Sequence, residues 1–137
     1  MDLRDAGAVG PVADAEHIEH VFARYAAAMA AHDFEGAAAL FAPDAVVRDP
    51  VDGKPLEGRA EIQRFFAAGA TILQGFILTG PVRIAGDGAQ AAAPLQARLD
   101  FGDGVQSLDS IDVMTFDDAG LIASMDAYYG PGNLRDA

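Results

Sequence analysis

Three side chains of this sequence, the phenol of Tyr25 and the carboxyls of Asp49 and Asp112, form a set that could move a proton. Burial disfavours the charged form of a carboxyl, whereas water and hydrogen-bond donors favour it. Two aspartates in unlike surroundings could therefore divide the work, one ionised as a base and the other protonated as a donor. Proton transfer next to a ketone suits this set, because a phenol and a neutral acid can both donate to an oxygen that gains negative charge.

The local sequence places each of the three residues where a pocket could receive it. Tyr25 belongs to an apolar stripe at helical spacing, so its ring is predicted to be buried. Asp49 ends an extended segment just before Pro50, from where a carboxylate could reach a cavity rim and act as the base. Asp112 falls on the more apolar face of a predicted strand, and Asp109 falls on the other face.

Each residue also has an ordinary structural interpretation. A tyrosine on the apolar stripe of a helix usually belongs to the core, with its hydroxyl bonded to backbone. An aspartate before a proline usually forms a turn, and an aspartate in a strand usually faces solvent. No local motif links the three positions, so the sequence leaves open whether Tyr25, Asp49 and Asp112 meet.

The N-terminal half is predicted to be mainly helical, because its apolar residues recur every three or four positions. We predict a loose lead over residues 1–12, followed by a helix capped by Asp14. A short second helix is capped by Asp33, runs through Phe41 and ends at Pro43-Asp44. A strand over residues 46–49 and a third helix opened by Gly58 come next.

From Phe76 onward the hydrophobic period changes to two residues, which is typical of strands. Three turn signals separate four extended segments. The turn signals are Gly86-Asp87-Gly88, Gly102-Asp103-Gly104 and Asp117-Asp118-Ala119-Gly120. This pattern predicts an antiparallel meander. Helices followed by a meander indicate an α+β fold in one domain over residues 1–137, with about three helices packed on one side of a curved, mostly antiparallel sheet.

Composition excludes several classes of function. The chain has no cysteine, which excludes thiol catalysis, cysteine-based zinc sites and disulfides. A net charge of −12 argues against nucleic acid or an anionic membrane as partner, since both require clustered Lys and Arg. No apolar run approaches the roughly 18 residues of a membrane span, and no secretory signal is recognised, so we expect a cytoplasmic protein without membrane insertion. His17 and His20 face outward without a third ligand, so no metal site is predicted.

The segments around these residues resemble the bacterial ketosteroid isomerases (steroid Delta-isomerases) of the NTF2-like superfamily, which implies a conical-barrel α+β fold. The likeness runs from about residue 14 to the C-terminus, and its matching segments are residues 23–25, 42–50, 56–62, 78–83, 110–116 and 124–129. The Asp-Pro and Gly-Arg segments occur widely in the superfamily. Tyr25, Asp49 and Asp112 together are more specific to the isomerases.

The resemblance implies a reaction and a site. Asp49 would take a proton from C4 of a β,γ-unsaturated 3-ketosteroid and return it at C6, and Tyr25 with a protonated Asp112 would stabilise the dienolate between these steps. A carboxylic acid kept neutral is a known feature of these enzymes. The implied wall of the steroid site, equally interpretable as core, is Phe65, Phe66, Leu95, Ala97, Leu99, Leu108, Met125, Ala127 and Tyr129. The resemblance also implies a homodimer, and it implies that the reaction requires no metal or organic cofactor.

Two other functions remain open. One is a polyketide cyclase or another NTF2-like enzyme that uses the same base and donors on an enolisable substrate. The other is a non-catalytic carrier of a hydrophobic ligand, which is disfavoured because a carrier gains nothing from a buried acid that is costly to desolvate. The chain departs from some family members at Phe41 and Phe66, where those proteins have a tyrosine network behind the catalytic phenol.

Overall fold

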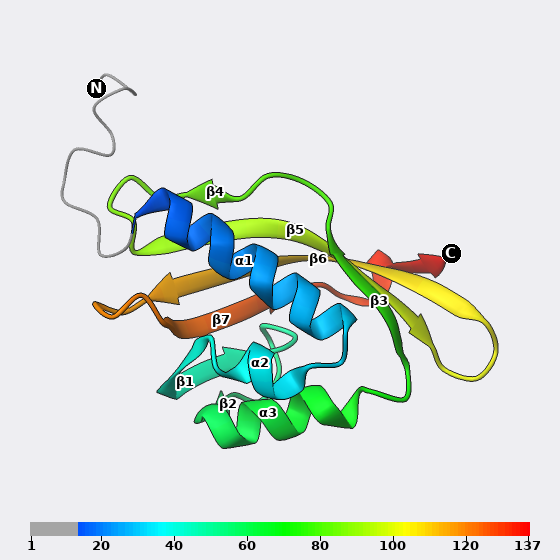
Figure 1. Ribbon diagram of the computed structural model, residues 1–137. Coiled ribbons are helices and arrows are strands. Elements are labelled where there is room, and N and C mark those ends of the chain that lie inside the picture. The colour runs from blue at the N-terminus through cyan, green and yellow to red at the C-terminus, as the bar shows by residue number, and fades with distance from the viewer. Residues whose placement is uncertain (1–13) are drawn as a thin grey trace.

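The computed structural model describes residues 14–137 and has helices on one face of a curved, open sheet (Figure 1). The predicted loose lead over residues 1–12 lies outside the described residues. Within them the helices are α1 (Ala15–Ala30), α2 (Phe34–Ala38) and α3 (Arg59–Ala68). The strands are β1 (Phe41–Arg48), β2 (Leu56–Glu57), β3 (Leu73–Leu78), β4 (Arg83–Ile84), β5 (Gln90–Asp100), β6 (Val105–Phe116), β7 (Ile122–Tyr128) and β8 (Leu134–Asp136).

The structure confirms the predicted helix starts. They were predictable because hydrogen bonds and backbone conformation within a few residues determine them. The Asp14 carboxylate accepts a hydrogen bond from the His17 N–H at 2.7 Å, and the Asp33 carboxylate accepts one from the Gly36 N–H at 2.9 Å. Each bond satisfies a backbone donor that the first turn of a helix leaves free. Gly58 precedes α3 with a φ of 89°, a backbone conformation that favours glycine.

The predicted end of the second helix was wrong. Helix α2 stops at Ala38, and Phe41 begins strand β1, which contains the exposed Pro43. The chain leaves the helix because it pairs with a distant strand, and the carbonyl of Leu40 accepts from the N–H of Ile122 at 2.9 Å. The register of β1 against β7 shifts between Phe41 and Val46, and this irregularity accommodates a proline that cannot donate to the ladder.

The sheet confirms the predicted meander and its turns. Its strand order is β2-β1-β7-β6-β5-β3, with β4 beside β5 and β8 beside β6. The pairs of β3 with β5, β5 with β6 and β6 with β7 are antiparallel, whereas β1 runs parallel to β7. The three predicted turn segments lie between β4 and β5, between β5 and β6, and between β6 and β7.

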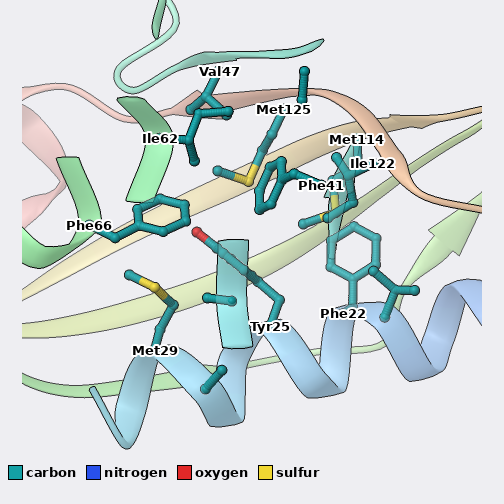
Figure 2. Close-up of a cluster of buried hydrophobic side chains, with 14 of the residues drawn as sticks. Phe22, Tyr25, Met29, Phe41, Val47, Ile62, Phe66, Met114, Ile122 and Met125 are labelled. Atoms are coloured by element: carbon teal, nitrogen blue, oxygen red, sulfur yellow. The ribbon is translucent and has the colours of Figure 1, made fainter. Parts of the chain in front are cut away.

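The hydrophobic core lies between α1 and the inner face of the sheet, as Figure 2 shows. Its labelled members are Phe22, Tyr25 and Met29 from α1, Phe41 and Val47 from β1, Ile62 and Phe66 from α3, Met114 from β6, and Ile122 and Met125 from β7. The guanidinium of Arg59 donates to the carbonyl of Phe41, which fixes the start of α3 against β1. No helix among residues 14–137 is both long and apolar enough to span a membrane.

Candidate active site

A largely apolar cavity of about 390 Å³ opens between the helix layer and one end of the sheet. It receives side chains from α1, α3, β3, β5, β6 and β7 and from the segments just after β1 and β7. Tyr25, Asp49 and Asp112 all line it, so the structure brings the three predicted chemical groups to one cavity.

Most of the predicted wall residues also line this cavity. They are Phe65, Phe66, Ala97, Leu99, Leu108, Ala127 and Tyr129. Leu95 and Met125 are not among its lining residues, and both are almost completely buried in the protein interior. The two therefore belong to the core beside the cavity.

Several lining residues were missed by sequence reasoning, namely Met29, Ala68, Gly69, Ile72, Leu73, Phe76 and Ser110. Met29 follows Tyr25 by one helical turn, so the stripe of α1 contained the signal for it. Ser110 shares a strand face with Asp112, two residues away. The segment from Ala68 to Leu73 joins α3 to β3, and its place at the cavity depends on tertiary packing alone.

The register of the sheet explains how two distant aspartates come to share one face. Asp112 lies opposite Ala127 in the pair of β6 and β7. Arg48 lies opposite Asp126 in the pair of β1 and β7, so Asp49 comes next to Ala127. Neighbouring strands are about 4.8 Å apart, which separates the backbones of Asp49 and Asp112 by roughly 10 Å. Between them Ala127 offers only a methyl group, and this leaves space for a ligand.

Asp112 is held in surroundings that favour its neutral form. Its side chain is 3% exposed. Burial raises the pKa of Asp112 to about 8, and the negative charge of Asp49 contributes in the same direction. The prediction that Asp112 and Asp109 lie in different environments is confirmed, because Asp109 lies on the outer face, where the Arg135 Nε donates to its carboxylate at 3.0 Å.

Asp49 occupies a different environment from Asp112. It is half-buried, and its carboxylate Oδ1 accepts a hydrogen bond of 2.5 Å from the Tyr129 hydroxyl. Burial raises the pKa of Asp49, but the bond from Tyr129 opposes this effect because it favours the ionised form. No such favourable donor acts on the pKa of Asp112 among the described residues, so Asp49 is the acid that loses its proton first.

Tyr25 is a buried phenol surrounded by aromatic rings. Its ring centroid lies 6.2 Å from that of Phe41, 6.0 Å from that of Phe66 and 5.6 Å from that of Phe76. Burial raises the pKa of Tyr25 well above its ordinary value, and the charges of Asp112 and Asp49 raise it further. Tyr25 therefore stays protonated and can donate a hydrogen bond. Two of the surrounding rings, Phe41 and Phe66, stand at the positions where some members of the resembled family have tyrosines.

The arrangement combines one carboxylate that can accept a proton with two neutral groups that can donate hydrogen bonds, in a cavity with a largely apolar lining. Charge that develops on a ligand oxygen is stabilised most by fixed donors in such a medium. The residues 14–137 contain no group of three or more His, Asp or Glu side chains that could hold a metal ion. The groups present suit removal of a proton from a carbon beside a carbonyl.

The chain belongs to the family of SnoaL-like domains, whose model matches residues 22–125. It is 38% identical over 117 residues to a steroid Delta-isomerase of Nocardioides simplex, across 85% of this chain and 93% of that protein. A solved structure of SalBIII, an epoxide hydrolase/cyclase-like enzyme studied for pyran ring formation in the polyether salinomycin, superposes with a TM-score of 0.82. That alignment covers 90% of this chain and 98% of the other at 23% identity, and it confirms the predicted NTF2-like fold. The family match and the likeness to the steroid Delta-isomerase support an enzyme.

Proposed function

We propose that this protein is a steroid Delta-isomerase, which moves a carbon–carbon double bond from the β,γ position into conjugation with a 3-keto group. The observation that carries the proposal is the pair of aspartates on one face of one apolar cavity, with Tyr129 donating to Asp49 and burial keeping Asp112 neutral. The likeness to the steroid Delta-isomerase of Nocardioides simplex supports the same reaction.

In the proposed mechanism, the Asp49 carboxylate removes a proton from C4 of a Δ5-3-ketosteroid. The electrons of the C–H bond move toward the carbonyl and form a dienolate, whose oxygen accepts hydrogen bonds from Tyr25 and from the neutral Asp112. Asp49 then returns the same proton at C6. The product has the double bond in conjugation, and neither an electron nor an atom is exchanged with another reactant.

The cavity also favours a neutral, largely apolar substrate. Its volume of about 390 Å³ lies within the range of about 300–1,000 Å³ that is common for small-molecule sites. No Lys, Arg or His of residues 14–137 lines it, so a ligand with a negative charge would meet two acids without a counter-ion. A flat hydrophobic ketone, such as a steroid, fits these conditions.

The direct test is to add a Δ5-3-ketosteroid to the purified protein and to follow the ultraviolet absorbance of the conjugated enone. We expect absorbance to rise in proportion to protein concentration. Turnover of a polyketide-like ketoester without steroid turnover would instead indicate another enolising enzyme of this fold. Tight steroid binding without isomerisation would indicate a carrier.

We further propose that the protein forms a homodimer through the outer face of the sheet. Ile77 and Ile111 are 54% and 49% exposed there, and Pro94 lies opposite Ile111. Exposed apolar patches on a sheet commonly mark an interface. Light scattering at micromolar concentration is expected to give twice the monomer mass, and Ile111→Asp is expected to lower it to the monomer value with an unchanged circular dichroism spectrum. A parent protein that is purely monomeric at this concentration would contradict the dimer.

A further inference from the structure

The cavity wall has one polar side chain that the proposed mechanism does not use. The lining residues with a hydroxyl or carboxyl side chain are Tyr25, Asp49, Ser110, Asp112 and Tyr129. Asp49 is the proposed base, Tyr25 and Asp112 are the proposed donors, and the Tyr129 hydroxyl donates to Asp49. Ser110 is therefore the one hydroxyl or carboxyl group among the described lining residues that has no part in the reaction.

Ser110 lies between the proposed oxyanion donors and the open end of the cavity. Alternate residues of β6 share a face of the sheet, so Leu108, Ser110, Asp112 and Met114 point to the same side. Met114 is 0% exposed and Asp112 is 3% exposed, whereas Ser110 and Leu108 are half-buried. Exposure rises from Asp112 toward Leu108. A ligand whose ketone reaches Asp112 must therefore pass Ser110.

The neighbours of Ser110 in the sheet leave its hydroxyl available to a ligand. Leu95 lies opposite Ser110 in the pair of β5 and β6, and its side chain has no polar atom. On the other side, the register of β6 against β7 brings Tyr129 next to Ser110. The hydroxyl of Tyr129 donates to Asp49 and is thus directed away from β6. The cavity is the remaining direction in which the Ser110 hydroxyl can find a partner.

The size of the side chain does not explain a serine at this position. Ala97 in β5 and Ala127 in β7 line the same wall and show that small apolar side chains occupy it elsewhere. A hydroxyl that a ligand covers without replacing its hydrogen bond to water lowers the affinity of that ligand. Ser110 therefore disfavours a purely apolar ligand and favours one that has an oxygen at this point.

Strand geometry gives the spacing between the two polar points of the wall. Ser110 and Asp112 are two residues apart in β6, so their side chains project in the same direction roughly 7 Å apart. Two ligand oxygens that meet both residues must be separated by a similar distance. In a steroid whose 3-keto oxygen meets Asp112, the third ring contains such a position at C11, whereas C17 lies well beyond it at the far end of the molecule.

Strand order also distinguishes the two edges of the ligand. Asp49 follows β1, and β7 lies between β1 and β6. Asp49 therefore approaches the edge with C4 and C6 from the side of β1, and Ser110 lies on the side of β6. The edge of the steroid that faces away from Asp49 contains C11. Spacing and strand order thus favour the same position.

We propose that Ser110 is a specificity-determining residue whose hydroxyl binds a second oxygen of the ligand, roughly 7 Å from the ketone oxygen. The substrate class is then a flat ketone with a hydroxyl or keto group on its third ring, at C11 in a steroid. This inference rests on the proposed function, because a ketone bound at Tyr25 and Asp112 determines which part of the ligand reaches Ser110.

The test measures equilibrium binding by calorimetry. The probes are a conjugated Δ4-3-ketosteroid without a further substituent, the two epimers with a hydroxyl at C11, and the analogue with a hydroxyl at C17. We expect the parent to bind one C11 epimer about fivefold more tightly than the unsubstituted steroid, which is the usual effect of one hydrogen bond. Ser110→Ala is expected to lose this preference. The effect of a C17 hydroxyl is expected to be equal in parent and variant.

A matched control is Ser107→Ala, which makes the same change in the same strand at a residue that does not line the cavity. It is expected to keep the parental preference for the C11 hydroxyl. A parent without a preference for either C11 epimer, or a preference that persists in Ser110→Ala, would overturn the proposal. Thermal unfolding of each variant checks that the folded fraction is equal.

Kinetics separate this inference from the proposed reaction. The ratio of kcat/KM for a Δ5-3-ketosteroid with the preferred C11 hydroxyl to that for the unsubstituted steroid is expected to fall about fivefold in Ser110→Ala. An inactive parent whose binding preference depends on Ser110 would refute the isomerase and uphold the specificity of the cavity. An active parent with the same ratio as Ser110→Ala would refute the role of Ser110 and leave the isomerase intact.

Discussion

Replacing Asp49 by asparagine is expected to lower the rate of steroid isomerisation by about 10²–10⁴-fold, the usual contribution of general acid–base catalysis. Asparagine has nearly the same shape, and its amide oxygen can still accept the hydrogen bond from Tyr129. The substitution therefore removes the basic atom and little else. The rate of enone formation at saturating steroid measures the loss.

A matched control is Asp44→Asn, which makes the same chemical change at an exposed residue of β1, the strand that ends just before Asp49. Its rate is expected to equal that of the parent. Binding of the conjugated product should survive in Asp49→Asn, because the apolar walls and both donors are retained. An Asp49→Asn protein that isomerises at the parental rate would rule out Asp49 as the base.

Much of the fold was predictable because local rules and tertiary structure agree. Asp14 and Asp33 cap helices by bonding to backbone donors within three residues, and the Gly-Asp-Gly segments form turns between strands. The prediction made the second helix too long, because the end of this helix depends on pairing with β7, which begins about 80 residues later in the chain. Helical spacing of Phe41 carries no information about that pairing.

The inner face of the sheet was predictable by parity, but its division into core and cavity was not. Alternation places Met125 and Ala127 on one face of β7, as it places Leu95 and Ala97 on one face of β5. The helix layer covers one end of these strands and leaves the other end open. Met125 and Leu95 therefore belong to the core, and Ala127 and Ala97 line the cavity.

The chemical groups were identified by residue type, periodicity and resemblance, whereas their meeting depends on strand register. Asp49 and Asp112 face one cavity because β7 lies between β1 and β6 and places Ala127 in the same row. Spacing along the chain cannot reveal this order. The contact between Tyr129 and Asp49 was missed for the same reason, since only the parallel pair of β1 and β7 brings the two ends together.

Activity is expected to fall as the pH rises past about 8, and Asp112→Asn is expected to remove this alkaline limb. Above its pKa of about 8, Asp112 loses the proton that it donates and places a negative charge beside the developing oxyanion. Asparagine keeps an N–H donor and does not titrate in this range. The pH profile of kcat/KM in parent and variant measures the difference.

Stability is expected to depend on pH through the same group. As pH rises from about 4 to about 8, Asp112 ionises in the unfolded chain but keeps its proton in the fold, so the free energy of unfolding falls. The contribution of the protonated Asp112 to the free energy of unfolding is fully present below about pH 4 and is lost above about pH 8. The rise in pKa from 3.8 to about 8 sets an upper limit of about 6 kcal/mol, at about 1.4 kcal/mol per pKa unit. Urea unfolding at pH 5 and pH 8 should show a smaller decline in Asp112→Asn than in the parent.

Two further variants separate donation from burial at this position. Asp112→Leu removes the donor altogether and is expected to lower kcat by about 10²–10³-fold at pH 6, as loss of one oxyanion donor does elsewhere. Asp109→Asn alters an acid on the outer face of the same strand, where Arg135 lowers its pKa, and should leave both the rate and the alkaline limb unchanged. If Asp112→Asn retained the parental alkaline limb, the titrating group would have to be another residue, and the assignment of this limb to Asp112 would be wrong.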